Sequence, residues 1–574
     1  MKILGLSDWR GSHDSSASII CDGNLVAIAE EERFSRQKHD GSVPLEAVDY
    51  CLRQAGISLQ DIDFIAFAGL PFRTGANSFL AELDRQFVLA AVRRGTFRKR
   101  TFLHKCLLDA CLAMGGGPAL NLGLDRYVSS GLHTLEQRFG ELPAIRYFGH
   151  HASHAAAAYL TSSVESATVV TIDGQGAMYS TVSWKTNGNE LVCLRAEPHT
   201  NSLGMFYLDC TEFLGLGEYG EGKTMGLAPY GQPESMKGPA RRLLDVSNHD
   251  WYRYDGPITA QKVGFERRTL EPVLEAPFPN FAAACQSQLE FAVAKVVGSA
   301  FQQTDAPDLC LGGGVMLNCS SNGALLAAGR FRSISIFPAS GDAGLSTGAA
   351  LLCAEQVGDL RRQPLPHPYW GPEFANNKCE EALRAEPRLS FSKCQDIAEE
   401  VARLLAHGQI VGWFQGRMEI GPRALGNRSI LADPRSIVIR DRVNRLKGRE
   451  LWRPLAPSVA VEASSDYFEL NAESPFMLFA ARVKPGKRAL VPGIVHVDGS
   501  ARPQTVRREQ NPRFYELIRA FERNTGIPVL LNTSFNAAGE PIVCTPGNAI
   551  ETFLAIGLDV LVLGDFIAKR RAPA

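Results

Sequence analysis

A pattern of strand, turn and hairpin occurs twice in the first third of the chain. In each copy an apolar segment leads into a polar, glycine-containing turn, and two further apolar segments follow. These two flank Asp22-Gly23-Asn24 in the first copy and Asn187-Gly188-Asn189 in the second, and such tripeptides are typical of tight β-hairpins. Recurrence of the unit after about 160 residues predicts a duplicated domain. The expected strands are 2–6, 16–21 and 25–29, then 167–172, 179–184 and 190–194.

Strands alternate with helices along the rest of the sequence, which predicts an α/β fold with mostly parallel sheets. A chain of 574 residues is too long for one ordinary core. Prolines 364, 366, 368 and 372 mark the best candidate linker. We therefore expect one domain over 1–358, a proline-rich linker over 359–376 and a second α/β domain over 377–574. The expected helices are 44–55, 318–329, 344–355 and 397–407, and the expected strands are 62–68, 308–311, 334–337, 410–414, 529–531 and 560–563.

The charge balance and the cysteines exclude some classes of protein. Lys plus Arg number 60 and Asp plus Glu 61, which argues against bulk binding to nucleic acid or anionic membranes. Thirteen cysteines without a Cys-x-x-Cys pair favour reduced thiols and a cytoplasmic location. The polar start of the chain is not typical of a signal peptide, and there is no apolar run long enough for a transmembrane helix.

One local exception to the charge balance runs from Arg85 to Lys105, within a basic helical insert expected at about 73–142. This stretch holds seven Lys or Arg and no acid. A solvated helix face is the simpler interpretation, and a site for an anionic substrate or partner is the alternative.

Two histidines and two aspartates form the first candidate site. His150 and His154 are four residues apart, so they share one face of the expected helix and could grip one metal ion. Asp173 and Asp342 each follow an expected strand, where α/β sheets gather their ligands. Two imidazoles and two carboxylates suit iron(II), zinc or manganese. The alternatives are a polar helix face, a role for His151 instead, and helix caps or turns for the aspartates.

Glycine-rich and cationic segments form two further candidate sites. Residues 215–231, with Lys223, and Gly312-Gly313-Gly314 before Asn318 could bring backbone amides close to a phosphate, although tight turns before packed helices would look the same. In the second domain, cations lie in loops rich in glycine and proline, which favours a polyphosphate over a salt-bridged surface. The polar residues of this third set are Arg423, Lys447, Arg449, Arg502, Ser534 and Asn536.

Ten segments in order identify a family. The chain resembles the NodU, CmcH and tobramycin-type O-carbamoyltransferases over essentially its whole length. The matching segments are EEERFSRQKH, HHASHAAAAY, DGQG, GKTMGLA, GGGVMLN, GDAGLSTGAA, GRMEIGPRALGNRS, KGRELWRPLAPS, ARPQTV and NTSFNAAGEPIV.

The resemblance implies a fold for each domain. The N-terminal domain would be similar to the TsaD-type tRNA threonylcarbamoyl transferases, with the duplicated ATPase fold shared by actin and the sugar kinases (ASKHA). The C-terminal domain would be YrdC-like, with Lys447, Arg449, Ser534 and Asn536 at the positions of the YrdC signature.

The resemblance also implies a chemistry. The YrdC-like domain would convert carbamoyl phosphate and ATP to carbamoyl-adenylate, with Arg423, Lys447, Arg449 and Arg502 stabilising developing charge. The TsaD-like domain would then transfer the carbamoyl group to a hydroxyl of a small molecule. A metal on the two histidines and two aspartates, expected to be iron(II), would hold phosphate oxygens and polarise the carbonyl, and Mg²⁺ could accompany ATP.

His13 is the candidate base for the acceptor hydroxyl, with Asp14 to orient it. Its position matches the acceptor-site histidine of the family, although an ordinary turn histidine is the alternative. The segment between Phe72 and Pro143 looks longer than in the tobramycin enzyme. It is a candidate wall of the acceptor pocket or a candidate contact between two copies of the chain, and its basic residues argue against a polycationic aminoglycoside acceptor.

Rival functions differ in what they leave unexplained. A metalloprotease would need Glu after the first histidine, where His151 stands. A nucleotide-binding scaffold would bind ATP without turning over carbamoyl phosphate, and carbamoylation of a macromolecule would replace the small acceptor. No nucleic-acid or membrane partner is expected, and antibiotic, lipo-oligosaccharide, sugar and polyketide hydroxyls remain open as acceptors.

Overall fold

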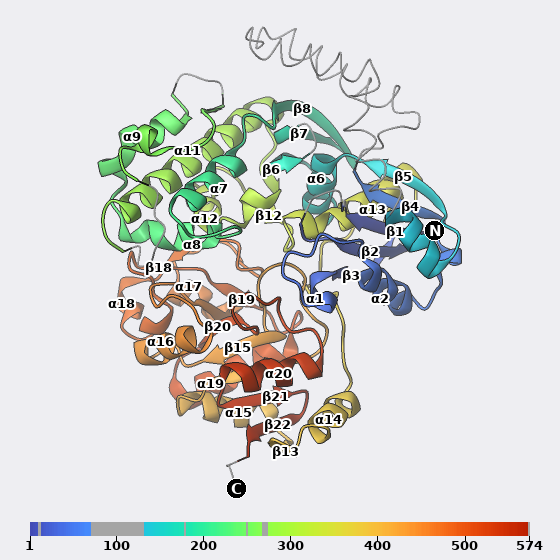
Figure 1. Cartoon of the computed structure of the whole chain (residues 1–574), viewed down its shortest axis with the longest axis vertical. Coiled ribbons are helices and arrows are strands. Elements are labelled where there is room, and N and C mark those ends of the chain that lie inside the picture. Colours follow the sequence, from blue (N-terminus) through green and yellow to red (C-terminus); the bar gives the residue numbers. More distant parts are fainter. Residues whose placement is uncertain are drawn as a thin grey trace.

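The computed structural model describes residues 1–7, 9, 13–69, 131–176, 179–247, 251–266 and 274–571. The expected basic insert lies largely outside these ranges. Two five-stranded sheets form the N-terminal part and one eight-stranded sheet forms the C-terminal part (Figure 1).

The two N-terminal sheets repeat one topology. The first has the order β3-β2-β1-β4-β5, and the second has the order β12-β11-β6-β7-β8. Each contains an antiparallel meander of three strands that is extended by two parallel pairings. The predicted duplication is therefore confirmed. The strands are β1 Lys2–Ser7, β2 Ser16–Cys21, β3 Asn24–Glu30, β4 Phe64–Ala68, β5 Ala144–Phe148, β6 Ala167–Gly176, β7 Tyr179–Asn187, β8 Glu190–Pro198, β11 Asp308–Gly312 and β12 Ser333–Ile336.

Both predicted hairpins form, because their turns use residues that tolerate left-handed backbone. Asp22 has φ 49° and Gly23 has φ 76°, as the tight turn between β2 and β3 requires. Gly188, with φ 59°, lies between β7 and β8 in the second copy. These turns fix the register of each meander and so decide which side chains face the core.

Two helices pack between the sheets and carry candidate residues toward one point. They are α6 His150–Leu160 and α13 Leu345–Gln356. A Cβ added at Gly348 of α13 would lie 1.8 Å from the carbonyl oxygen of Ser153 in α6, so only glycine permits this close approach. The alanine run 155–158 is buried at the same interface, which explains why small residues dominate both helices.

Other helices cover the outer faces of these sheets (Figure 1). The long helix α11 lies against the second sheet, and α2 lies against the first. Pro44 is the N-cap of α2 and not its first residue as predicted. The helices are α2 Leu45–Ala55, α7 Leu203–Phe213, α8 Glu221–Leu227, α9 Lys237–Leu243, α11 Phe278–Thr304 and α12 Cys319–Ala327.

The C-terminal sheet has the order β13-β22-β21-β14-β15-β20-β16-β19, and five of its seven pairings are antiparallel. The prediction of mostly parallel sheets is therefore wrong, although the mixed α/β class is confirmed. Periodicity identifies a buried strand but not the direction of its neighbours. The strands are β13 Leu389–Lys393, β14 Val411–Phe414, β15 Arg428–Ala432, β16 Ala456–Ala460, β19 Gln504–Val506, β20 Val529–Ser534, β21 Val560–Leu563 and β22 Phe566–Arg570.

Helices pack on this sheet as well, among them α15 and α19, which contact each other. The main helices are α14 Asn376–Arg384, α15 Ile397–Ala406, α16 Ile437–Leu446, α19 Pro512–Thr525 and α20 Pro546–Ile556. Residues 357–375 form no helix or strand and connect this part to the first. None of the helices in the described ranges is long and apolar enough to cross a membrane.

The N- and C-terminal parts are joined by polar contacts that are largely buried. The Gly421 amide donates to Glu30 Oε1 at 2.6 Å, and Arg33 donates to the Gly421 carbonyl at 2.8 Å. Arg33 also pairs with Glu30 at 2.7 Å. Arg417 donates to the carbonyl of Trp370 at 2.6 Å and to that of Val26 at 3.3 Å. These bonds hold the edge of the first sheet against the loop before β15.

Candidate active site

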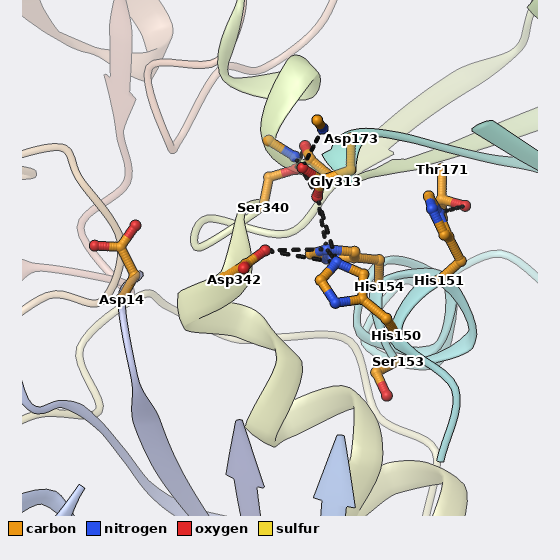
Figure 2. Close-up of polar contacts among 12 residues, drawn as sticks. Asp14, His150, His151, Ser153, His154, Thr171, Asp173, Gly313, Ser340 and Asp342 are labelled. Carbon is orange, nitrogen blue, oxygen red and sulfur yellow. Dashed lines mark hydrogen bonds and ion pairs between the residues drawn. The ribbon is translucent and has the colours of Figure 1, made fainter. Parts of the chain in front are cut away.

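Four side chains from three places in the chain converge between the two N-terminal sheets (Figure 2). His150 and His154 come from α6, Asp173 from β6, and Asp342 from the turn before α13. His154 Nε2 lies 2.9 Å from Asp173 Oδ2 and 3.6 Å from Asp342 Oδ1. His150 Nε2 lies 3.7 Å and 3.6 Å from the same two atoms. We name these four residues the His/Asp centre.

The donor set of the His/Asp centre fits a divalent cation. The two Nε2 atoms are only 3.0 Å apart, so both rings present the same type of nitrogen to one point. Burial lowers the pKa of His154, but its contacts with Asp173 and Asp342 outweigh burial and raise the pKa to about 9. Burial raises the pKa of Asp173, but its contacts with His150 and His154 outweigh burial and hold this pKa well below its usual value. Ionised carboxylates beside two histidines make a pocket that favours a cation.

The backbone around Asp173 keeps its carboxylate in place. Oδ2 accepts from the Gly314 amide at 3.0 Å, and Oδ1 accepts from the Gly174 amide at 2.6 Å. A Cβ at Gly313, where φ is 93°, would lie 2.2 Å from the Ile172 carbonyl oxygen. The glycines at 312–314 thus allow the end of β11 and the loop that follows it to pack closely against β6. They lie next to Asp173 and His154 of the His/Asp centre.

His151 lies apart from the centre. Its Nδ1 is 3.0 Å from Thr171 Oγ1, and its Nε2 is 3.0 Å from the carbonyl oxygen of Tyr179. Burial lowers the pKa of His151 to about 3, so it is a neutral residue of the core. The alternative that His151 and not its neighbours serves the site is therefore not supported by the geometry.

Other residues of the glycine-rich candidate site have local partners. Asn318 caps α12 by accepting from the Ser321 amide at 3.0 Å, and its amide group also exchanges hydrogen bonds with Gln286. Lys223 of α8 pairs with Glu450 at 3.2 Å, across the boundary between the two parts of the chain. A role for either in binding phosphate stays a prediction.

A second polar cluster contains both residues predicted to activate the acceptor. His13 Nδ1 lies 2.8 Å from Asp14 Oδ2, and His39 Nδ1 lies 2.9 Å from Asp14 Oδ1. Burial lowers the pKa of His13, but Asp14, Asp342 and Asp173 raise it to about 9 overall. The two histidines hold the pKa of Asp14 well below its usual range against the effect of burial. Figure 2 places Asp14 across from the His/Asp centre.

The sequence did not predict His39 as a site residue. It lies in the EEERFSRQKH segment, yet no spacing rule links it to Asp14, because the contact depends on how the loop after the short helix α1 Glu32–Ser35 folds back. Tyr219 was also missed, and its ring stacks on His39 with centroids 4.0 Å apart.

The predicted cations of the C-terminal part gather at the end of β20. Lys447 Nζ donates to the side-chain oxygen of Asn536 at 2.8 Å and to its carbonyl at 3.0 Å, and it also contacts Ser534. Arg449 donates to Thr533 Oγ1 at 3.2 Å. The structure thus brings the four predicted signature residues, Lys447, Arg449, Ser534 and Asn536, into one cluster.

The cations of this cluster have no directly paired carboxylate among the described residues, although Glu540 acts on Lys447 and Glu450 acts on Arg449 from a greater distance. Within the described ranges, Arg423, Lys447, Arg449 and Arg502 have no carboxylate within the 4.0 Å of an ion pair, and the Nε atoms of the three arginines are buried without a partner. Burial and neighbouring cations lower the pKa of Lys447 and of Arg449 well below their usual values. Burial and Arg502 likewise lower the pKa of Arg423 to about 9. Lys447 is buried and the three arginines are half-buried, and cations removed from water in this way favour an anion as their partner.

A duplicated α/β fold with a buried His/Asp centre is thus joined to a second α/β part that holds a cluster of cations. The chain belongs to the carbamoyltransferase family. The family model described as "Carbamoyltransferase N-terminus" matches residues 2–351, and the model described as "Carbamoyltransferase C-terminus" matches residues 402–570.

Named relatives fit this family. The nodulation protein NolNO of Sinorhizobium fredii is 37% identical over 98% of this chain and 80% of its own length. The 3'-hydroxymethylcephem-O-carbamoyltransferase of Amycolatopsis lactamdurans is 34% identical over 60% of this chain and 64% of its own. Among solved structures, component A of the Acidaminococcus fermentans (R)-2-hydroxyglutaryl-CoA dehydratase is 14% identical, with a TM-score of 0.32, and the match covers 62% of this chain and 99% of that one.

Proposed function

We propose that the protein is an ATP-dependent O-carbamoyltransferase that acts through carbamoyl-adenylate on a hydroxyl of a small molecule. The observation that carries this proposal is a cluster of one buried and three half-buried cations without directly paired carboxylates among the described residues, in a member of the carbamoyltransferase family. Such a cluster is suited to polyphosphate, and carbamoyl phosphate and ATP are both phosphate esters or anhydrides of high charge.

The proposed reaction has three steps. Water cleaves carbamoyl phosphate to carbamate and phosphate. A carbamate oxygen then attacks the α-phosphorus of ATP, and the bond to pyrophosphate breaks. Finally the acceptor oxygen attacks the carbonyl carbon, the bond between this carbon and the AMP oxygen breaks, and the hydroxyl proton passes to a base.

The C-terminal cluster would serve the first two steps. Lys447 is held by the backbone and side chain of Asn536, so its ammonium group is fixed before any ligand arrives. Arg423, Arg449 and Arg502 would place further donors around the phosphates. Because these groups are already desolvated and oriented, they would stabilise developing negative charge without reorganisation.

The N-terminal sites would serve the transfer. In its neutral form, His13 would accept the proton of the acceptor hydroxyl through Nε2, since its Nδ1 is engaged by Asp14. Because the nearby carboxylates raise the pKa of His13 to about 9, this form becomes more populated, and transfer faster, as the pH rises toward 9. A divalent cation, which we expect to be iron(II), would be held by His150, His154, Asp173 and Asp342 and would supply Lewis-acid polarisation of the carbonyl. The name of the cephem relative supports an alcohol acceptor of small size.

The test is to follow pyrophosphate release and carbamoyl-adenylate, by mass spectrometry, from purified protein with ATP, carbamoyl phosphate and ferrous iron but no acceptor. We expect pyrophosphate that depends on carbamoyl phosphate. Lys447→Ala should reduce it at least about 100-fold, because one fixed charge at a transition state contributes roughly 3 kcal/mol. The exposed Arg445, on the helix that precedes Lys447, provides the matched control Arg445→Ala.

The variant His150→Ala separates the two sites. It should keep most of the pyrophosphate release, because His150 lies in the N-terminal part, away from the cation cluster. Binding of ATP without any pyrophosphate that depends on carbamoyl phosphate would reject the proposal in favour of a nucleotide-binding scaffold.

A further inference from the structure

Asp14 stands between two histidines and uses one carboxylate oxygen for each. His13 donates to Oδ2 and His39 donates to Oδ1, at 2.8 and 2.9 Å, both through Nδ1. With both oxygens engaged, the carboxylate cannot rotate without breaking one of the bonds. Each ring is left with Nε2 as its remaining polar atom.

The His39 side of this cluster is fixed from several directions. The backbone amide of His39 donates to Glu32 Oε2 at 2.8 Å. The ring of Tyr219 stacks on the ring of His39, with an interplanar angle of 23°. Side-chain exposure is 43% for His13 but 25% for His39, so His13 is the more accessible of the two.

The backbone of the cluster is strained, as it often is where function requires a fixed geometry. Asp14, His39 and Tyr219 have φ values of 63°, 57° and 56°. Seven non-glycine residues of the described ranges have positive φ, and these are three of them. Asp and His tolerate this region, but a tyrosine there is unusual. These three residues come from separate loops: His39 bonds to the carboxylate of Asp14, and Tyr219 stacks on His39.

We infer that His39 is a positioning residue for the hydroxyl-activating step: it holds Asp14 Oδ1, so that Oδ2 keeps the His13 ring oriented with Nε2 toward the acceptor. The inference rests on the proposed function for its chemistry, since it assumes that His13 receives the acceptor proton. His39 itself does not contact the acceptor, because Tyr219 covers one face of its ring and Glu32 holds its backbone.

The same three residues could instead hold a second cation, since their ligand atoms lie within 4.8 Å of one another. The two arrangements differ in whether the Nδ1 atoms of His13 and His39 carry protons. In the positioning arrangement both Nδ1 atoms carry a proton that is donated to Asp14, whereas Nδ1 atoms that bind a cation carry none.

The protons on Nδ1 of His13 and His39 can be observed directly by NMR, with the full-length protein labelled with ¹⁵N-histidine and without substrate. The Nδ1–H signals of His13 and His39 should be strongly deshielded and protected from exchange with water, and His13→Gln and His39→Gln spectra assign them. The test pair is His39→Asn, whose side-chain amide can replace the Nδ1–H donor, and His39→Gly, which removes the donor. Both residues tolerate the positive φ at this position.

In His39→Gly, exchange of the His13 Nδ1–H should become at least tenfold faster, and in His39→Asn it should stay close to that of the unaltered protein. An unchanged rate in a folded His39→Gly protein, checked by circular dichroism, would overturn the inference.

A titration with Zn²⁺ tests the unaltered protein independently of whether His39→Gly folds. Retention of both Nδ1–H signals after the second equivalent has been added supports the positioning role. Loss of both signals at the second equivalent would assign the trio to a cation and overturn it. The NMR experiments contain no substrate, so they can contradict the role of His39 while the pyrophosphate assay still supports the proposed function, and the reverse also holds.

Discussion

At the scale of single residues, the His/Asp centre combines groups that are costly to bury apart. In this centre the Nε2 atom of each histidine lies less than 4 Å from one oxygen of each aspartate and from the Nε2 atom of the other histidine. Removing one ligand should therefore weaken the binding of a cation sharply, whereas removing the neighbouring His151 should not, because that ring bonds to Thr171 and Tyr179.

We predict that His154→Ala binds a divalent metal at least about 100-fold more weakly, a larger loss than the 10- to 100-fold typical of residues that only support a ligand. Metal per protein after dialysis, measured by plasma mass spectrometry, checks this. His151→Gln is the control on the same helix and should retain the metal. Equal metal content in His154→Ala and the unaltered protein would contradict the assignment of the centre.

The pairing of His13 with Asp14 predicts a dependence of stability on pH. The pKa of His13 is raised to about 9 from 6.5, so its stabilising contribution is complete below pH 6.5 and is lost as the pH rises through 9. Asp14→Asn should thus lower the free energy of unfolding more at pH 6 than at pH 9.5. Because the His13 side chain is 43% exposed, solvent screening reduces the difference to about 1 kcal/mol.

Urea unfolding at the two pH values measures this difference. The control is Asp305→Asn, which makes the same substitution at an exposed position of left-handed backbone, with φ 51°. A destabilisation by Asp14→Asn that grows with pH would show that the ion pair has the opposite sign from the one inferred.

At the scale of secondary-structure elements, the geometry of the His/Asp centre depends on how closely α13 approaches α6. Gly348 permits this approach, since an added Cβ would clash with the backbone of Ser153, next to His154. Asp342 lies in the turn that leads into α13, so a shift of this helix would also move a ligand of the centre.

We predict that Gly348→Ala destabilises the protein by about 2 kcal/mol or more, as overpacking against backbone does, and weakens metal binding although no ligand is changed. Thermal unfolding and metal content measure the two effects. Gly547→Ala is the matched control, because it also lies in a helix but its added Cβ meets nothing closer than 3.7 Å. Normal metal binding in Gly348→Ala would mean that the helices can separate without disturbing the centre.

At the scale of the whole molecule, the contact between the two parts depends on a buried network of charges. Arg33 is 3% exposed and pairs with both Glu30 and Glu32, and Glu30 accepts from the Gly421 amide in the C-terminal part. Loss of the arginine would leave two carboxylates buried without a cation.

Arg33→Met should therefore lower the free energy of unfolding by about 3–5 kcal/mol, and adding Glu30→Gln should restore part of this loss. Denaturant unfolding followed by tryptophan fluorescence gives both values. Arg53→Met, which breaks an exposed ion pair with Asp49, is the control and should cost less than about 1 kcal/mol. If the two arginine variants cost the same, the buried network does not hold the parts together.

The sequence by itself determined the duplication and a part of the elements. Hairpin turns such as Asp22-Gly23 are local, and alternation of apolar residues reports burial, so the predicted strands and helices lie close to the observed bounds, but the longest described helix, α11, and several strands of the C-terminal sheet were not predicted. It also indicated the ligands of the His/Asp centre, because the spacing of His150 and His154 sets them on one helical face and strand ends collect carboxylates.

Only the tertiary structure decided what depends on contacts between distant segments. The direction of the strands in the C-terminal sheet was predicted wrongly, because burial alone does not distinguish parallel from antiparallel neighbours. The bond of His39 to Asp14 and the pairing of Lys223 with Glu450 join loops that no local pattern relates. A side chain's chemistry is fixed by its type, but its partner is fixed by the packing of the whole chain, and that packing brings the candidate residues into working positions.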